Sequence, residues 1–340
     1  MLIIDGIAFH NVTATTTTPG LPGVSLHRVP PSVCAELNTF AQGVGLCPTH
    51  AELRFVTAAP KVRLHLYSAG HHEYARVYRG DFFVIEHCIE PNQTLVIELD
   101  VPSGPAALSP EIPAGGRFAP GVWRVRLSGT HRVHYVGIET EGHAVRPPLP
   151  EETPARRWLA HGSSITMGFS SCRLGTPWIQ LAAAELGLDV LNLGFGGSAH
   201  IDLALAAHIA AREDWDLCSI EAAINLVDQP VPLAEIALRA AAFLDCLTRV
   251  RRDVRIVVIT SFLSRQDLLG REKPGHHLLD ELRQIWRDAV AACPRRDQIL
   301  LLEGTELLDT PAGLTADLVH PSDEGHVRIA GRIARALVNV

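Results

Sequence analysis

The sequence lacks the features that mark membrane-spanning, secreted or nucleic-acid-binding proteins. No window approaches the ~20 consecutive apolar residues of a membrane span. The N-terminal stretch MLIIDGIAFHNV has neither a basic segment nor a long apolar core, so we expect no secretory signal. A formal net charge of −7 argues against nucleic acid or an anionic membrane surface as a main partner.

Paired cysteines and clustered metal ligands are also missing. The seven cysteines are scattered from Cys34 to Cys293 without a Cys-x-x-Cys pair. This pattern is typical of reduced, mostly buried thiols, so we expect a cytoplasmic protein. The pairs His71–His72 and His276–His277 have no clear Cys, His or Asp partner at ligand spacing. We therefore predict solvated loops there and no metal site.

The composition is that of a globular chain long enough for two domains. Of 340 residues, 47% are hydrophobic and 20% charged. Before residue 150 the chain shows short segments rich in Val, Ile, Tyr and Phe, separated by turn residues and without helical patterns between 52 and 140. This pattern predicts an antiparallel β-sandwich or jelly roll over residues 1–145. The segments are ELRFVT, KVRLHLYSA, EYARVYRG, FFVIEHCI, QTLVIELDV, VWRVRLSG and RVHYVGIET.

A Pro-rich, charged stretch then predicts a linker over 146–156, and the rhythm changes to strand followed by helix. Five such alternations over 157–340 predict a parallel sheet covered by helices. In sheets of this kind functional groups follow the carboxyl ends of the strands. The corresponding segments here are HGSSIT, GFGGSAHID and EAAINLVD, with TADLVHPSDEGH before the last helix.

These four segments resemble, in the same order, the four sequence blocks of the SGNH or GDSL hydrolases. The resemblance covers about 180 residues and implies a flavodoxin-like parallel sheet with helices on both faces. It assigns Ser164 as nucleophile, His320 as base and Asp317 as the carboxylate that orients the base. It also assigns an oxyanion hole to the Ser164 N–H, the Gly197 N–H and the Asn225 amide.

The residue chemistry agrees with these assignments. A serine hydroxyl needs a base to become a nucleophile, and a histidine with a pKa near neutrality can be that base. Asp317 lies three residues before His320 and can hold its tautomer. Ser164 lies where a strand turns into a helix, and free N–H groups there favour negative charge.

Several alternatives remain at individual positions. Ser163 stands where the family often has Asp or Asn, and we expect it to shape the turn. Gly196 competes with Gly197 as the oxyanion glycine. Asn225 has a second possible role as a helix cap. His326 is a rival to His320, although a histidine inside a helix is more often a packing or surface residue.

Two positions depart from the family pattern. Ala223 replaces the usual Gly and Leu226 the usual Asp, which affects local backbone geometry more than the reaction. GFGGSA faintly resembles a phosphate loop, but it lacks the Gly-Lys-Ser/Thr ending.

The N-terminal domain carries no motif. A β-sandwich before such a hydrolase domain is similar to family 2 carbohydrate esterases and to a salicylyl acyltransferase of tetracycline biosynthesis. Phe118 and Trp123 flank an Ala-Pro-Gly turn and are candidates for stacking on a sugar or aromatic ring, with sandwich core and rim as the alternative.

The sequence thus predicts a serine esterase that cleaves an O-ester of a small molecule or carbohydrate without a cofactor. The first alternative is an O-acyltransferase that uses an acceptor alcohol, for example on an aromatic polyketide. The second is a catalytically inert ligand-binding protein.

Overall fold

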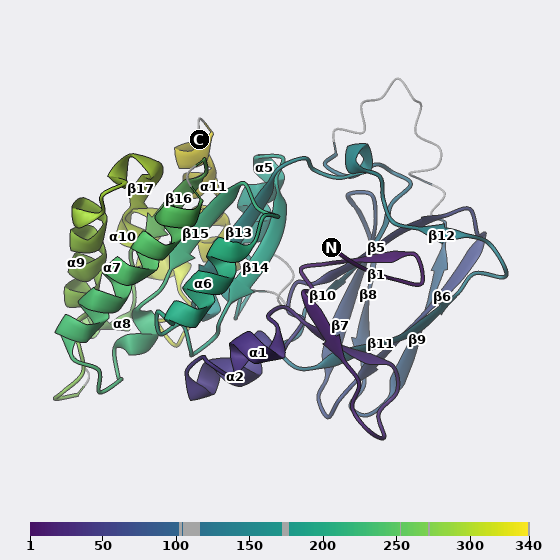
Figure 1. The fold of residues 1–340 in the computed structure, drawn as a ribbon, viewed down its shortest axis with the longest axis horizontal. Helices are drawn as coiled ribbons and strands as arrows, with labels where there is room; N and C mark the ends of the chain where they lie inside the picture. The colour runs from purple at the N-terminus through teal and green to yellow at the C-terminus, as the bar shows by residue number, and fades with distance from the viewer. Residues whose placement is uncertain (102–103, 105–115, 172–176, 252, 271–272, 339–340) are drawn as a thin grey trace. The chain divides into compact units, whose positions relative to one another are not determined.

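The chain folds into two compact units. The computed structural model describes residues 1–101, 104, 116–171, 177–251, 253–270 and 273–338. Unit 1 comprises Met1–Pro31 and Val44–Ala155, and unit 2 comprises Ser32–Gly43 and Arg156–Val340 (Figure 1). In the described ranges, no helix has the length and apolar character needed to cross a bilayer.

Unit 1 consists of two antiparallel sheets. The seven β-segments predicted between residues 52 and 140 are confirmed as β5 to β11. One sheet has the order β1-β2-β5-β10-β7-β8, with β12 paired to β5. The other has the order β3-β4-β11-β6-β9. The strands of the first sheet are Leu2–Ile4, Ile7–His10, Glu52–Thr57, Trp123–Leu127, Glu73–Arg79, Phe82–Ile89 and Val145–Arg146. Those of the second are Ala14–Thr16, Val24–His27, Val133–Glu139, Lys61–Ser68 and Thr94–Asp100.

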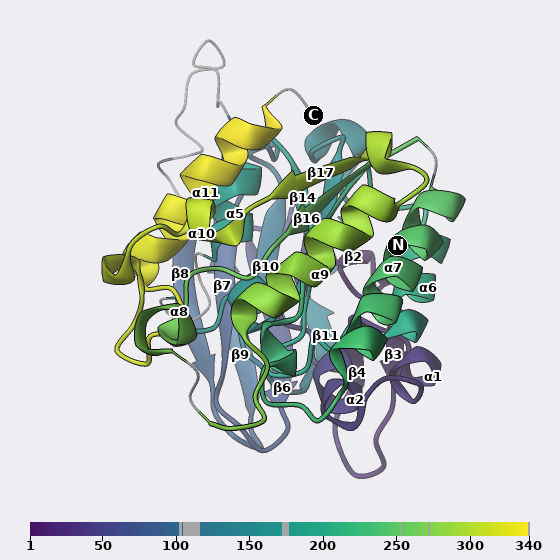
Figure 2. The same ribbon diagram turned by 90° about the vertical axis from the view of Figure 1, so that its left-hand side faces the viewer.

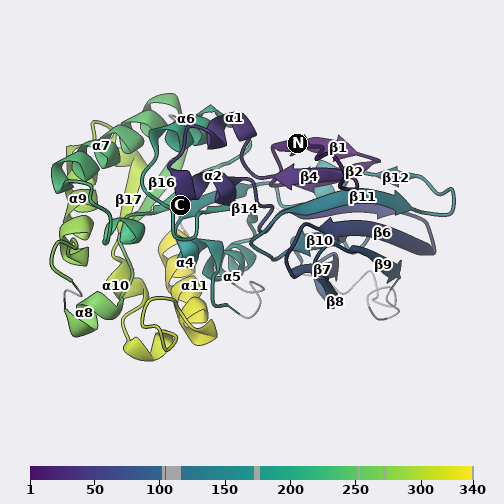
Figure 3. The ribbon, with the colours of Figure 1, turned by 90° about the horizontal axis from the view of Figure 1, so that it is seen from below.

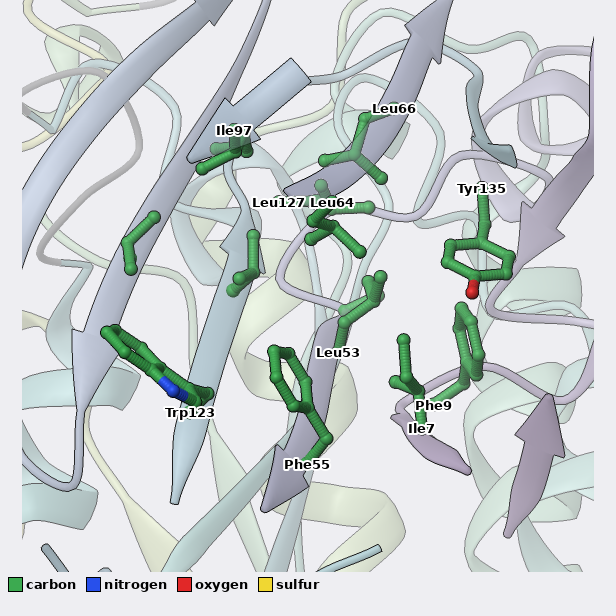
Figure 4. Packing of buried hydrophobic residues seen from close by; sticks show 14 of the residues in the cluster. Ile7, Phe9, Leu53, Phe55, Leu64, Leu66, Ile97, Trp123, Leu127 and Tyr135 are labelled. Carbon is green, nitrogen blue, oxygen red and sulfur yellow. The ribbon is translucent and has the colours of Figure 1, made fainter. Parts of the chain in front are cut away.

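A single apolar core joins the two sheets of unit 1. Side chains alternate across a strand, so one face of each sheet can be apolar. β6 follows this rule, with buried Val62, Leu64 and Leu66 separated by more exposed residues. They share one cluster with Phe9 and Phe55 of the first sheet (Figure 4). The two sheets therefore pack their apolar faces together, as expected for a sandwich.

Unit 2 contains a five-stranded parallel sheet in the order β14-β13-β15-β16-β17. Numbered along the chain this order is 2-1-3-4-5, one of the two common doubly wound orders. Almost every residue of the three central strands is buried, as expected when helices cover both faces. The strands are Asp189–Gly194, Arg157–Gly162, Leu217–Glu221, Arg255–Ile259 and Ile299–Leu302.

Helices flank this sheet on two sides (Figures 2 and 3). α5 and α11 share an apolar cluster with the sheet, in which Trp158 and Ile259 are members. α6, α7 and α9 lie on the opposite face (Figure 3). The long helices are α5 Trp178–Glu185, α6 Leu203–Ala211, α7 Leu233–Val250, α9 Leu279–Ala292 and α11 Asp323–Leu337. Shorter ones are α1 Pro31–Cys34, α2 Thr39–Gly45, α4 Ser164–Met167, α8 Arg265–Leu269 and α10 Gly304–Leu307.

The unit boundaries differ from the expected ones at two places. Residues 146–156 were expected to be a linker, yet Arg146 pairs with Val56 in β5 and its guanidinium binds Glu152. Ser32–Gly43 belongs to unit 2 rather than to the β-rich unit that surrounds it in sequence. The reason lies at Asn38, which binds Ser198 and Asp202 near the start of α6.

Candidate active site

The parallel sheet brings the predicted blocks to one edge. β13, β14 and β15 run in the same direction and end at Gly162, Gly194 and Glu221, which lie in register. Because the carboxyl ends of parallel strands share an edge, the segments after them become neighbours. A tight turn leads from β13 into α4, and it contains the two adjacent serines.

The two serines have different environments. Ser163 is fully buried and is the N-cap of α4, where its Oγ accepts a hydrogen bond from Ile165 N–H (3.1 Å). Ser164 is the first residue of α4, so its own N–H has no acceptor within the helix. The helix ends after one turn at Gly168, which has a left-handed backbone (φ 94°). The turn thus presents Ser164 and secures Ser163.

A continuous hydrogen-bonded chain joins the predicted nucleophile, base and carboxylate. Ser164 Oγ lies 2.8 Å from His320 Nε2. His320 Nδ1 lies 2.7 Å from Asp317 Oδ2. The other Asp317 oxygen accepts the backbone N–H groups of Val319 and His320 and the hydroxyl of Thr315. The carboxylate at Nδ1 favours the imidazole tautomer that leaves Nε2 able to accept the serine proton.

The electrostatics of Asp317 match this arrangement. Partial burial opposes its ionisation, but hydrogen bonds from the side chain and backbone of His320 and from Val319 N–H outweigh burial. The pKa of Asp317 is therefore held well below its ordinary value. An ionised carboxylate here stabilises a positive charge on His320 when the imidazole takes a proton.

Three residues in the segments after β14 and β15 are candidate oxyanion donors. A Cβ on Gly196 would come within 3.6 Å of Ser164 Cβ, so this backbone passes directly beside the nucleophile. Gly197 has a left-handed φ of 68° and open space where a Cβ would stand. Among the described residues, no backbone hydrogen bond uses the N–H of either glycine. Asn225 Oδ1 accepts from Ala199 N–H (3.1 Å), which leaves the Nδ2 end of the amide as the donor.

The departures from the family pattern have local consequences. Ala223 adopts φ 112°, a conformation that suits glycine, the residue it replaces. Leu226 is fully buried and fills its position with apolar volume. Asn225 lies inside the short 3₁₀-helix Ile224–Leu226 rather than at its N-cap, so the capping alternative is not seen.

His326 is separated from this chain of contacts by its burial. It is fully buried in α11, and its Nδ1 accepts the Trp178 N–H (3.3 Å). Burial lowers the pKa of His326 to about 4, which makes it a neutral packing histidine. Phe169 is instead the aromatic residue beside His320, with ring centroids 4.8 Å apart, and its side chain is 48% exposed.

The proposed stacking roles of Phe118 and Trp123 are wrong for this structure. Their exposed fractions are only 3% and 1%. The guanidinium of Arg124 lies over the Phe118 ring at 3.6 Å, and that of Arg79 over the Trp123 ring at 4.7 Å. Rings already covered in the interior of unit 1 have no face to offer a sugar.

One side-chain cluster has the chemistry of a metal site. His72, Cys88 and Glu90 each place a ligand atom within 4.8 Å of the others. Sequence spacing missed this group because His72 faces Glu90 across the β7–β8 pair, as the register of Glu73 with Ile89 requires. His277 Nε2, by contrast, lies 2.7 Å from the Val231 carbonyl, which is a structural contact.

Two further residues near the site escaped the sequence analysis. Glu221 is 1% exposed and binds the backbone and hydroxyl of Ser163. Its signal was an acidic residue at the end of an otherwise apolar strand. Asn38 binds the segment that follows Gly197, and no local pattern predicted this contact across 160 residues or more.

Comparisons with known proteins bear on the fold and on a family match. No curated protein matches the sequence. Solved structures match in fold at 12–16% identity. The salicylyl-acyltransferase SsfX3 from a tetracycline biosynthetic pathway gives a TM-score of 0.77 at 16% identity, over 98% of this chain and 95% of that chain.

Family two carbohydrate esterases also match. The one from Cellvibrio japonicus gives a TM-score of 0.64 at 14% identity, over 98% of this chain and 95% of that chain. An active site mutant of the one from Clostridium thermocellum gives 0.63 at 12% identity, over 99% and 98%. Residues 160–328 match the GDSL-like Lipase/Acylhydrolase family and include all four blocks described above. By this match, which covers just under half of the chain, unit 2 is similar to the GDSL-like lipases and acylhydrolases.

Proposed function

We propose that the protein is a serine-dependent esterase that cleaves an O-ester of a small molecule or carbohydrate through an acyl-enzyme. One observation carries the proposal, the unbroken chain from Ser164 Oγ through His320 to Asp317 with contacts of 2.8 and 2.7 Å. Nucleophile, base and orienting carboxylate in this geometry are the parts that acyl transfer by serine requires.

In the proposed reaction Ser164 Oγ attacks the ester carbonyl carbon while its proton moves to His320 Nε2. The carbonyl electron pair becomes an oxyanion, which the Ser164 and Gly197 N–H groups and Asn225 Nδ2 stabilise. Collapse of this intermediate breaks the ester C–O bond, and His320 returns the proton to the leaving alcohol. Water then attacks the acyl-enzyme with His320 again as base, which releases the acid and restores Ser164.

Covalent labelling tests the nucleophile. A fluorophosphonate should label the unaltered protein at Ser164 and should not label Ser164→Ala. Ester turnover by Ser164→Ala should fall by several orders of magnitude, because the reaction then lacks its nucleophile. Circular dichroism is the control for folding. An unlabelled but folded wild-type protein would instead support an inert ligand-binding protein, and a label mapped to Ser163 would reassign the nucleophile.

Transfer to an alcohol is the second candidate outcome. It is supported by the likeness in fold to a protein named a salicylyl-acyltransferase, while other neighbours are named esterases. Hydrolysis and transfer use the same residues and differ only in whether a bound alcohol outcompetes water. A well-oriented bound acceptor can reach an effective molarity of ~10⁵ M or more.

The ratio of transfer to hydrolysis separates these outcomes. One activated ester is turned over with increasing concentrations of a hydroxylated acceptor, and both products are quantified. Under hydrolysis as the main reaction, transfer should grow linearly and stay in proportion to the acceptor-to-water ratio. A saturable excess of transfer at millimolar acceptor would show an acceptor site and make the acyltransferase the better description.

A further inference from the structure

Glu221 lies under the turn that carries the two serines. It is the last residue of β15 and its side chain is 1% exposed. Its Oε2 accepts three hydrogen bonds, from Ser163 N–H (3.0 Å), from Ser163 Oγ–H (2.7 Å) and from Thr166 Oγ–H (3.0 Å). One carboxyl oxygen therefore holds the residue before Ser164 and a residue two places after it.

The turn at Gly162 packs closely against this carboxyl. A Cβ on Gly162 would come within 2.3 Å of Thr166 Oγ1 and 2.8 Å of Glu221 Oε2. Glycine at this position lets the turn approach the acidic side chain. Ser163 Oγ donates to Glu221 and also accepts from Ile165 N–H, so the helix cap depends on the same contact. Displacement of the carboxyl would release both ends of the turn.

We propose that Glu221 is a positioning residue for the nucleophile. It orients Ser164 toward His320 by binding the residues on both sides of Ser164, without contact to the reacting atoms. This role deepens the proposed function and rests on it. Small misplacements of a reacting group are costly, since a shift of about 1 Å can reduce a rate by ~10²-fold.

The neutral form of this side chain provides a matched control. Burial raises the pKa of Glu221 to about 7, although hydrogen bonds from Ser163 and Thr166 oppose that rise. In mildly acidic solution the group is therefore an uncharged acid that accepts through one oxygen. Glu221→Gln keeps the shape, the neutrality and an accepting oxygen, whereas Glu221→Leu keeps similar volume but no acceptor.

The experiment compares these variants at pH 6. We measure kcat and KM on an activated ester, and the second-order rate of fluorophosphonate labelling at Ser164. Glu221→Gln should remain within ~3-fold of the unaltered protein. Glu221→Leu should lose ~10–100-fold in kcat and in labelling rate, with KM changed by less than ~3-fold. The reason is that the variant loses the orientation of Ser164 but keeps the binding of substrate. Thr166→Val removes one of the three donors and should lose less, about 3–10-fold.

Other outcomes overturn the inference. A folded Glu221→Leu protein with native kcat and labelling rate would show that the contact of Glu221 with Ser163 and Thr166 does not orient Ser164. Equal losses in Glu221→Gln and Glu221→Leu would show that the accepting oxygen is not the reason. If Glu221→Leu does not fold, the test falls to Thr166→Val. A native rate of fluorophosphonate labelling in that variant would then contradict the proposed role of Glu221. Failure of the unaltered protein to label at all would overturn the proposed function first, which is a separate readout.

Discussion

At the scale of single residues, two neighbouring hydroxyls are separated by what they touch. Ser163 has no exposure and is held by Glu221 and Ile165, whereas Ser164 reaches His320. Ser163→Ala removes one of the three donors to Glu221 Oε2 and leaves the Ile165 N–H without its side-chain acceptor, and an unsatisfied buried group costs about 1–3 kcal/mol. We expect a clearly lower urea midpoint but continued labelling at Ser164 at low temperature. A folded Ser163→Ala protein that no longer labels would contradict this division of roles.

Asn225 offers a second test at this scale. Its Oδ1 is occupied by Ala199 N–H, so its Nδ2 is the donor proposed for the oxyanion. Loss of one such donor typically costs ~10²–10³-fold in kcat. Asn225→Ala should show that loss with a smaller change in KM, because the charge exists only in the transition state. A change confined to KM would make Asn225 a substrate-binding residue instead.

The backbone conformation of Ala223 leads us to expect that Ala223→Gly is more stable than the unaltered protein. Its φ of 112° is sparsely populated by residues with a Cβ and costs of order 1–3 kcal/mol. Ala223→Gly relieves that strain but makes the unfolded chain more flexible, by up to about 1 kcal/mol. We expect a net rise in melting temperature of a few degrees, which differential scanning calorimetry can measure. A lower melting temperature would mean that the alanine methyl contributes more by packing than it costs in strain.

The sequence predicted residues whose signal is local and missed those whose signal is tertiary. Asp317 and His320 lie in one short loop, and their assignment came from the resemblance of that loop to the last block of the family. Glu221 lies 58 residues from Ser163, and only strand register brings them together. Phe118 was misassigned for the same reason, since burial under Arg124 depends on where β7 and β10 pair.

At the scale of elements, long amphipathic patterns mark the helices that alternate with the strands of unit 2. α7 (Leu233–Val250) and α11 (Asp323–Leu337) are the longest of these helices. The periodic apolar stripe of these helices is present in the sequence itself. Nothing comparable marks α1 and α2, which are four and seven residues long and packed through a polar contact. Which unit they join is decided by Asp202, 164 positions away from Asn38.

Asn38 supplies the prediction for this element. Its side chain donates to Asp202 Oδ2 (2.7 Å) and to the Ser198 carbonyl (3.0 Å), and Ser198 follows the proposed oxyanion glycine. Asn38→Ala should loosen that segment and lower kcat by ~10-fold, with labelling at Ser164 slowed in parallel.

Gln42→Ala is the matched control, because Gln42 Nε2 donates to the Ala35 and Leu37 carbonyls of its own segment. Its kinetics should stay close to those of the unaltered protein. Equal effects of the two substitutions would indicate that α2 as a whole, rather than the contact to Ser198, supports activity.

At the scale of the whole molecule, Glu221 links stability to pH. In the unfolded chain this carboxyl has its ordinary pKa of 4.5, and in the folded protein the pKa is about 7. Between these values the unfolded state has lost the proton that the folded state keeps, so stability falls as pH rises. The loss amounts to about 3 kcal/mol, at 1.36 kcal/mol per pKa unit. Below pH 4.5 the contribution is fully retained.

Glu221→Gln removes this linkage. The difference in unfolding free energy between the variant and the unaltered protein should shift in favour of the variant from pH 4.5 to 7 and then level off. Tryptophan fluorescence is the suitable probe, because four of the five tryptophans, all but Trp123, lie in unit 2. A pH-independent difference would show that the folded and unfolded carboxyls titrate alike.

The segment Ser32–Gly43 has a consequence for the order of synthesis. It is made before the rest of the unit that receives it, which runs from Arg156 to Val340. At ~5–20 residues per second, the roughly 300 residues after Gly43 take about 15–60 s to be made. During that interval the rest of unit 2 has not been fully made, whereas the β-rich sequence around the segment can already fold. The unit that carries the candidate active site thus includes residues made well before the rest of it, and it is complete only when its last helix, α11, has been made.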